Sequence, residues 1–333
     1  MKKSLKSMAL GLAIVPCALV LTACGGGDGG ININTDGNYA AVETTEYANV
    51  LADLQTRGLT VEDIIGGARL TLDVDANVGL AGVTMGVTMS SDNYIRNSSE
   101  AGTLDVTKVD MISENSLTMT TTAGEETTTT EASAYMYFSQ GVQYVDLTEA
   151  EELLTGFGAS LPSLKFSQSL VTGNPEEDVA ATPEFNIADL LQYIPEGSYG
   201  TGLVIETSEE EDDYKVRVTL NGTFMQEYVT GMLAESDPEL ASTVTFNSFG
   251  DIVIYVVCNA DGLVGMNVTG SVDMTIAITV AEGQDPMLVT VDGDIELNMA
   301  GYNGEFDMPT DLNEENYSPI DVDGPKETEQ VQG

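Results

Sequence analysis

The sequence predicts an α+β fold, in which a few helices pack on the concave face of one large curved antiparallel β-sheet, a half-barrel. The first observation behind this prediction is a long alternation near the C-terminus. Every even position from Val264 to Val280 is apolar or Gly, and the alternation resumes in the opposite phase from Met287 to Met299. A period of two residues is typical of strands with one apolar and one polar face, so these stretches predict a long hairpin. The second observation is that stretches of helical periodicity separate the groups of strands.

The apolar residues fall at even positions in the first strand of this hairpin and at odd positions in the second, which restricts the register of the pairing. Residues of opposite parity must pair, and we expect Val280 to lie opposite Met287. A flat strand of about 17 residues would be about 55 Å long, much longer than usual strands. We therefore expect the hairpin to bend, with Gly270 and Gly293 as bend points, and to form a trough or a partly closed barrel.

The N-terminal residues have the pattern of a secretory signal. Three lysines precede an apolar run from Met8 to Val20 that is too short to span a membrane, and Leu21-Thr22-Ala23-Cys24 follows. This ending resembles the lipobox of bacterial lipoproteins, which implies that Cys24 is acylated, for example with palmitate, and becomes the mature N-terminus. The alternative is an ordinary secreted protein with a chance cysteine. We expect a signal peptide over residues 1–23 and a Gly-rich tether over 24–40, with residues 31–39 as linker.

A single β-rich domain is expected over residues 41–317, followed by an acidic disordered tail over 318–333. A first helix is predicted over Ala41–Gln55, because Tyr47, Val50, Leu51 and Leu54 share one face, and a short turn follows at 60–63. Two further helices are predicted over Ile187–Ile194 and Thr223–Ala234. The expected strands cover Leu70–Val78, Val83–Met89, Thr103–Ile112, Ser116–Thr122, Thr127–Phe138, Val142–Leu147, Thr201–Thr207, Tyr214–Leu220, Val244–Phe249 and Ile252–Cys258. The Thr-rich stretch Thr118–Thr130 is expected at an exposed edge of the sheet, because threonine favours strands.

The charge balance excludes several partners. All 54 acidic residues but only eight basic residues follow the predicted signal, which leaves a net charge of −46. We therefore expect no nucleic acid and no electrostatic adhesion to anionic lipid, so that acyl chains must provide any membrane attachment. Cys17 is removed with the predicted signal and Cys24 is the predicted acylation site, so Cys258 is the one cysteine left. We expect it to be a buried structural thiol.

Several common catalytic and binding motifs are missing from the sequence. Without any histidine there is no His-based triad and no ordinary zinc site, and phosphate-binding glycine loops are absent. The stretch Asp73–Gly79 has the wrong spacing for a calcium loop and continues a strand pattern, while Glu209–Asp213 is expected to be a solvated hairpin tip or a weak calcium site. We expect no enzymatic activity, no cofactor and no bound metal.

Several segments resemble a known family. The lipobox, the Met-rich alternating strands, the stretch Tyr135-Met136-Tyr137-Phe138-Ser139-Gln140-Gly141-Val142-Gln143-Tyr144-Val145 and the closing Phe306-Asp307-Met308-Pro309 are similar to LolA-like/LppX-like lipoproteins of Gram-positive bacteria. The resemblance covers about residues 41–310. It implies a half-barrel sheet closed by helices, whose interior in some relatives holds lipid or acyl chains.

The methionines suggest what the interior holds. Met is unbranched and polarizable, so it suits exchangeable apolar contents as well as an ordinary core. We expect a non-enzymatic lipoprotein on the extracytoplasmic face of the cell membrane, Gram-positive more readily than Gram-negative, that binds or shields lipid or another apolar ligand between sheet and helices. The alternative is an envelope scaffold protein with a solid core. The candidate lining residues are Met85, Met89, Leu190, Ile194, Phe224, Tyr228, Met266, Val268, Met274, Met287 and Met299.

Overall fold

The computed structural model describes residues 31, 33–57, 66–80, 82–100, 103–156, 158, 161, 163–171, 178–181, 191, 194–210, 212–278, 286–304, 307–313 and 315–319. The predicted signal, Cys24, the turn at 60–63, Leu190 and most of the predicted helix Ile187–Ile194 lie outside these residues.

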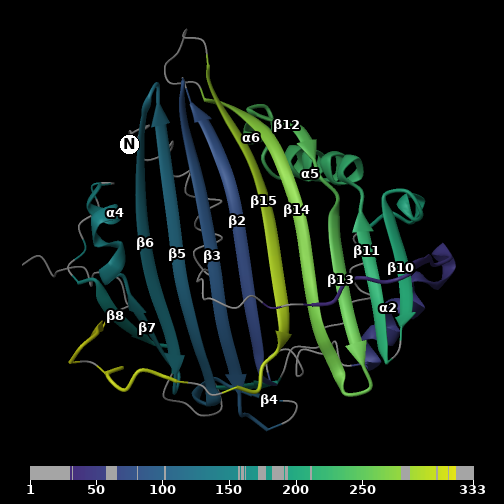
Figure 1. The fold of residues 1–333 in the computed structure, drawn as a ribbon, viewed down its shortest axis with the longest axis horizontal. Helices are drawn as coiled ribbons and strands as arrows, with labels where there is room; N and C mark the ends of the chain where they lie inside the picture. Colours follow the sequence, from purple (N-terminus) through teal and green to yellow (C-terminus); the bar gives the residue numbers. More distant parts are fainter. Residues whose placement is uncertain are drawn as a thin grey trace, which may run out of the picture.

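One large open β-sheet, mostly antiparallel, with a few helices makes up the described part of the chain (Figure 1). Its strand order is β1-β10-β11-β13-β14-β15-β2-β3-β5-β6-β7-β8-β16, with β12 paired to β14; β4 and β9 form a separate two-stranded sheet. Only the β16–β8 pairing in the large sheet is parallel. The strands are β1 (Ala40–Ala41), β2 (Ala68–Leu80), β3 (Val83–Asn97), β4 (Thr103–Asp105), β5 (Val109–Ala123), β6 (Glu126–Ser139), β7 (Val142–Asp146), β8 (Lys165–Ser169), β9 (Val179–Ala181), β10 (Leu203–Glu210), β11 (Asp213–Leu220), β12 (Val244–Phe249), β13 (Ile252–Asn259), β14 (Gly262–Ile278), β15 (Met287–Gly301) and β16 (Ser318–Pro319).

The predicted hairpin forms the centre of the sheet as β14 and β15, beside the second long Met/Val hairpin, β2 and β3. Even positions of β14 pair with odd positions of β15, as expected, but Met287 lies opposite Ile278 and not opposite Val280. The error has a simple cause. A slip of two residues leaves every side chain on its face, so the alternation fixes parity and leaves the register open.

The two faces of the sheet differ in polarity from β10 to β3. Directly paired residues of an antiparallel sheet point to the same side. One side, which we call the apolar face, carries Ile205, Val218, Val256, Met266, Ile295, Val74 and Val87. The other side, which we call the polar face, carries Arg217, Tyr255, Asn267, Glu296, Asp73 and Ser90.

The helices gather toward the two lateral edges of the sheet (Figure 1). The α-helices are α2 (Tyr47–Thr56), α4 (Glu151–Gly156), α5 (Gly222–Ser236) and α6 (Pro238–Ala241), and the 3-10 turns are η1 (Thr44–Glu46), η2 (Val106–Lys108), η3 (Thr148–Ala150) and η5 (Glu196–Ser198). The helix predicted over Thr223–Ala234 is confirmed by α5. The first predicted helix is confirmed by α2, but its expected start at Ala41 is wrong, because Ala41 lies in β1 and the α-helix begins at Tyr47.

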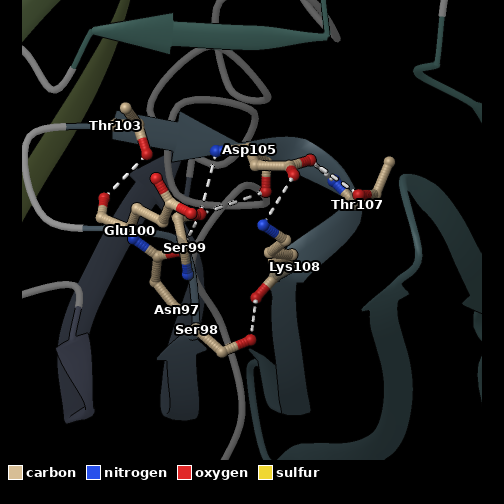
Figure 2. Close-up of polar contacts among 8 residues, drawn as sticks. All are labelled: Asn97, Ser98, Ser99, Glu100, Thr103, Asp105, Thr107 and Lys108. Carbon is tan, nitrogen blue, oxygen red and sulfur yellow. Dashed lines mark hydrogen bonds and ion pairs between the residues drawn. The ribbon is translucent and has the colours of Figure 1, made fainter. Parts of the chain in front are cut away.

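The expected single strand Thr103–Ile112 is wrong. The chain forms β4, turns through η2 and only then begins β5, which continues without a break through the expected strand Ser116–Thr122. Figure 2 shows the cause: an Asp105 carboxylate oxygen accepts hydrogen bonds from the Thr107 backbone N–H at 3.0 Å and from its hydroxyl at 2.6 Å. The Lys108 ammonium reaches the other oxygen at 3.3 Å. Such a side-chain cap competes with the strand ladder.

Residues 33–39, expected to be linker, instead pack across the polar face. The Ile33 side chain lies against Gly265, the Tyr39 ring contacts the Tyr255 ring at 6.0 Å between centroids, and the buried Lys215 ammonium donates to the backbone oxygen of Asp36 at 2.5 Å. The expectation of a disordered tail is wrong for Ser318 and Pro319, which form β16; residues 320–333 lie outside the described residues.

Candidate functional site

The main hydrophobic core lies where β10, β11 and β13 present the apolar face. These strands contribute Leu203, Ile205, Val216 and Val256, none more than 1% exposed. Their β-branched and leucine side chains alternate with polar residues such as Glu206 and Arg217, which fixes the face that each strand buries. The buried Cys258 belongs to the same cluster, so the expectation of a buried thiol is confirmed.

Helix α2 closes one side of this region. Tyr47, Leu51 and Leu54 recur at helical spacing and are at most 3% exposed. The Tyr47 hydroxyl donates to the backbone oxygen of Leu203 at 3.3 Å, which fixes the start of the helix on β10. At its other end, Arg57 pairs with Asp53 at 2.9 Å and stands 4.2 Å above the Tyr214 ring, and burial raises the pKa of that tyrosine.

Helix α5 closes the other side and is held at its first turn. The Asn221 side-chain oxygen accepts from the backbone N–H groups of Thr223 and Phe224, at 3.0 and 3.4 Å. The Asp251 carboxylate accepts from the N–H of Gly222 at 2.8 Å. The Phe224 ring can approach the sheet because residue 202 is glycine: a Cβ there would lie 2.8 Å from the ring.

Between these two helices and the sheet lies a cavity of about 220 Å³. Strand residues form its floor, α2 and α5 form its walls, and two residues of the segment before η5 complete it. The lining residues are Leu51, Leu191, Ile194, Leu203, Ile205, Val218, Leu220, Phe224, Met225, Tyr228, Ile254 and Val256. The Phe224 and Tyr228 rings stack at 6.0 Å between centroids and give the helical wall an aromatic surface.

The chemistry of this cavity is that of an apolar container. None of its lining residues is charged, and the Tyr228 hydroxyl is the one polar side-chain group among them. Such a lining offers no nucleophile, no tuned acid or base and no metal ligands. The described residues as a whole contain no group of three or more Cys, Asp or Glu side chains placed to hold a metal ion.

The volume limits what the cavity can hold. An apolar cavity of about 150 Å³ can bind benzene, whereas pockets for drug-sized ligands measure about 300–1,000 Å³. A volume of about 220 Å³ therefore suits an aromatic ring or a short length of an acyl chain, with the rest of a longer molecule outside.

The residues predicted from the sequence fall into separate groups. Ile194, Phe224 and Tyr228 line the cavity, and Met266 packs against the core cluster beside it. Met85 and Met89 belong to a second cluster around Val87 on β3, away from the cavity. The remaining described candidates, Val268, Met274, Met287 and Met299, lie on the apolar face of β14 and β15 without lining the cavity.

Sequence reasoning missed the strand floor of the cavity. Ile205, Val218 and Val256 alternate with polar neighbours as clearly as the methionines do, and Leu51 belongs to the predicted helical stripe. The signal was present, but alternation alone does not show which part of a long sheet the helices cover.

Comparisons with known proteins find little. The chain matches no protein-family profile and no curated protein. Among solved structures, it is similar to the translocator domain of autotransporter NalP from Neisseria meningitidis, with 6% identity, a TM-score of 0.23, and coverage of 78% of this chain and 100% of that one. It is also similar to DynF from the dynemicin biosynthesis pathway of Micromonospora chersina, with 8% identity, a TM-score of 0.16, and coverage of 84% and 92%. Within the described residues, none of the helices has the length and apolarity to cross a bilayer.

Proposed function

We propose that this chain is a lipid-anchored, non-enzymatic lipoprotein of the LolA-like/LppX-like kind, held by Cys24 outside the cell membrane, that binds part of an apolar molecule between α2, α5 and the sheet. The cavity of about 220 Å³ with its uncharged lining is the observation that carries the proposal. Apolar surface of this kind binds a guest mainly by removing it from water, and needs no directed polar contacts.

The apolar face continues beyond the cavity and supports the same conclusion. On β15, the Ile295 side chain is 44% exposed although it points to the apolar face, and Val83 on β3 is 37% exposed. An acyl chain whose end fills the cavity would find further apolar surface along these strands. Burial of each CH₂ group contributes about 0.8 kcal/mol, so additional contacts of this kind raise affinity appreciably.

Ligand binding is tested by filling the cavity. Val218→Phe adds volume on the cavity floor, while Val253→Phe adds the same volume on the neighbouring strand, where residue 253 points to the polar face. We expect Val253→Phe to bind a fluorescent fatty acid like the unmodified protein and Val218→Phe not to bind it. Native mass spectrometry should likewise detect co-purified lipid with Val253→Phe and none with Val218→Phe. Equal binding by both variants, or no binding by the unmodified protein, contradicts the proposal.

The anchor is tested separately. Cys24→Ala removes the only residue that the lipobox-like ending offers for acylation, and we expect the protein to move from the membrane fraction to the soluble fraction. A mass spectrum of the unmodified protein should show the added acyl chains on Cys24. Loss of the anchor should leave fatty-acid binding unchanged, since the described lining residues all fall between Leu51 and Val256.

One observation favours the second candidate, an envelope scaffold protein with a solid core. Met89 is only 6% exposed and packs with Met85, Val87 and Leu117 as in an ordinary core. The scaffold hypothesis predicts that no lipid is ever recovered with the protein.

A further inference from the structure

The upper half of β6 forms a long edge of the sheet. β6 pairs with β5 from Glu126 to Phe138 but with β7 only from Tyr135 to Ser139. In the described part of the chain, no strand pairs with the other side of residues 126–134. Within this stretch we call residues 126–131 the β6 edge; its side chains are exposed apart from the half-buried Thr130. Figure 1 shows β6 as the outermost of the long strands on its side.

The turns at both ends of β6 show which backbone groups are free. Each of the hairpins β5–β6 and β6–β7 has a two-residue turn, closed by the pairs Ala123–Glu126 and Ser139–Val142. Residues that flank such a turn exchange hydrogen bonds with each other. Even residues of β6 therefore bond to β5, and odd residues point to the other side. Thr127, Thr129 and Glu131 thus present unpaired N–H and C=O groups in a row at the edge.

Within the described residues, the other edges of the large sheet are short or lie against other elements. The edge strand β12 contacts α5, and the Gln226 side chain donates to the backbone oxygen of Phe246. At one end, β1 pairs with β10, and the Val42 N–H and Asn38 N–H bond to Ile205 and Glu210. At the opposite end, β16 pairs with β8. Exposed sheet edges promote uncontrolled pairing, and proteins ordinarily cover or charge them. No described strand pairs with the β6 edge, which carries Glu126 and Glu131 at its ends.

The surroundings of the β6 edge carry only one sign of charge. Between Lys108 and Lys165 the sequence contains nine acidic residues and no basic residue. Three of the nine, Glu149, Glu151 and Glu152, lie on η3 and α4, which contact β6. A second copy of this chain is disfavoured as the occupant. Pairing the edges of two copies would bring the acidic residues of both, among them Glu126 and Glu131, close together without any basic residue of the edge to offset them.

We infer that the β6 edge is a docking site for an extended, basic segment of another protein, which adds to the sheet as one more strand. Main-chain hydrogen bonds to Thr127, Thr129 and Glu131 supply affinity, and the acidic residues select basic partners. Residues opposite Glu126 and Glu131 are five apart in the partner, so a partner with Lys or Arg at that spacing fits the site. This site is separate from the apolar cavity and does not depend on the proposed ligand.

The test uses a blocked, fluorescent peptide, Lys-Val-Thr-Val-Thr-Lys, and the full-length protein. Binding is measured by fluorescence anisotropy, and amide exchange is measured on fragments that cover residues 124–134. We expect saturable binding that weakens with salt, together with new protection of the odd-numbered amides. Thr129→Pro removes one edge-facing N–H without removing a bond to β5, and prolines are tolerated at such positions. It should weaken binding about tenfold or more.

Two controls separate strand addition from general attraction to an acidic surface. Thr129→Val keeps the backbone N–H and should bind the peptide like the unmodified protein. The double variant Glu126→Lys/Glu131→Lys should no longer bind this peptide and should instead bind the peptide Glu-Val-Thr-Val-Thr-Glu. The inference is overturned if no peptide binds, if Thr129→Pro and Thr129→Val bind equally, or if the charge-swapped pair fails to associate. If Thr129→Pro does not fold, the charge swap and the exchange pattern decide alone.

Discussion

At the scale of single residues, the most consequential polar contact is a buried carboxylate on the polar face. Asp92 is 1% exposed and accepts two hydrogen bonds from the Arg69 guanidinium, at 2.8 and 2.6 Å. The Tyr94 hydroxyl donates to the same carboxylate at 3.0 Å, and burial, with the Asp92 charge as the second cause, raises the pKa of Tyr94 to about 12. These contacts join β2 to β3 across the polar face.

Removing the cation should therefore be costly. Arg69→Leu leaves Asp92 buried without its charge partner, and we expect a loss of about 3–5 kcal/mol in the free energy of unfolding. Tyr94→Phe removes one hydrogen bond and should cost about 1–3 kcal/mol. Denaturant titration measures both. The double variant Arg69→Leu/Asp92→Leu should be more stable than Arg69→Leu alone; if it is not, the unpaired charge is not the cause.

A second residue-scale effect concerns like charges on neighbouring strands. Asp73 lies directly opposite Glu296, and burial, then Glu296, Asp75 and Asp92, raise the pKa of Asp73. A carboxyl group whose pKa is raised by folding costs no stability below its ordinary pKa, where it is protonated in both states, and destabilises the folded state fully once pH exceeds the folded value. The cost is therefore fully present at neutral pH.

Asp73→Asn should consequently raise the melting temperature at pH 7, and the gain should disappear as pH falls below about 4, the ordinary pKa of aspartate. Asp261→Asn, in the turn between β13 and β14, is the matched control and should change little. A gain that persists at low pH would show that charge repulsion is not its source.

At the scale of elements, the first turn of α5 positions one wall of the cavity. Asn221→Ala removes the side chain that caps Thr223 and Phe224, and such caps contribute about 1 kcal/mol. We expect lower stability and weaker binding of a fluorescent fatty acid, because Phe224 is no longer held over Gly202. Asn221→Asp keeps the capping oxygen and should restore both properties. Weaker binding by Asn221→Asp as well would mean that the cap does not position the wall.

The sequence predicts elements well where their pattern is long. The faces of the side chains in β14 and β15 were predictable, because side chains of a strand alternate between the two faces of the sheet. The residue opposite Met287 was not predictable, because alternation does not fix the length of the loop between the strands. The break before β5 could not be read from alternation, because a single carboxylate, Asp105, ends the strand. Residues 33–39 have the composition of a linker, and only their contacts with Gly265, Tyr255 and Lys215 show that they are ordered.

At the scale of the whole molecule, the sequence predicted the sheet, but of the described candidate lining residues only Ile194, Phe224 and Tyr228 line the cavity. The apolar face extends from β10 to β3, so any part of it could have received helices. Both α2 and α5 cover β10, β11 and β13, and this placement results from long-range packing. For example, the Tyr47 hydroxyl donates a hydrogen bond to the backbone oxygen of Leu203, 156 positions away in the sequence.

The net charge of −43 is a property of the whole chain. Acidic residues repel one another over several ångströms at low ionic strength, and salt screens that repulsion. We expect the melting temperature to rise between about 0.01 and about 0.5 M sodium chloride, most steeply at the low end, where the Debye length is longest. A melting temperature that falls over this range would mean that attractive ion pairs such as Arg69–Asp92 outweigh the repulsion.

The path of residues 33–39 determines how the fold would respond to mechanical load. A pull on the N-terminal end would act across the flat of the sheet, at Ile33 beside Gly265, before it reached any strand. The segment would peel away one contact at a time toward β1, whose ladder with β10 is only two residues long. Such a force would thus detach residues 33–39 from the polar face and expose the Lys215 ammonium, while the long central strands stayed paired.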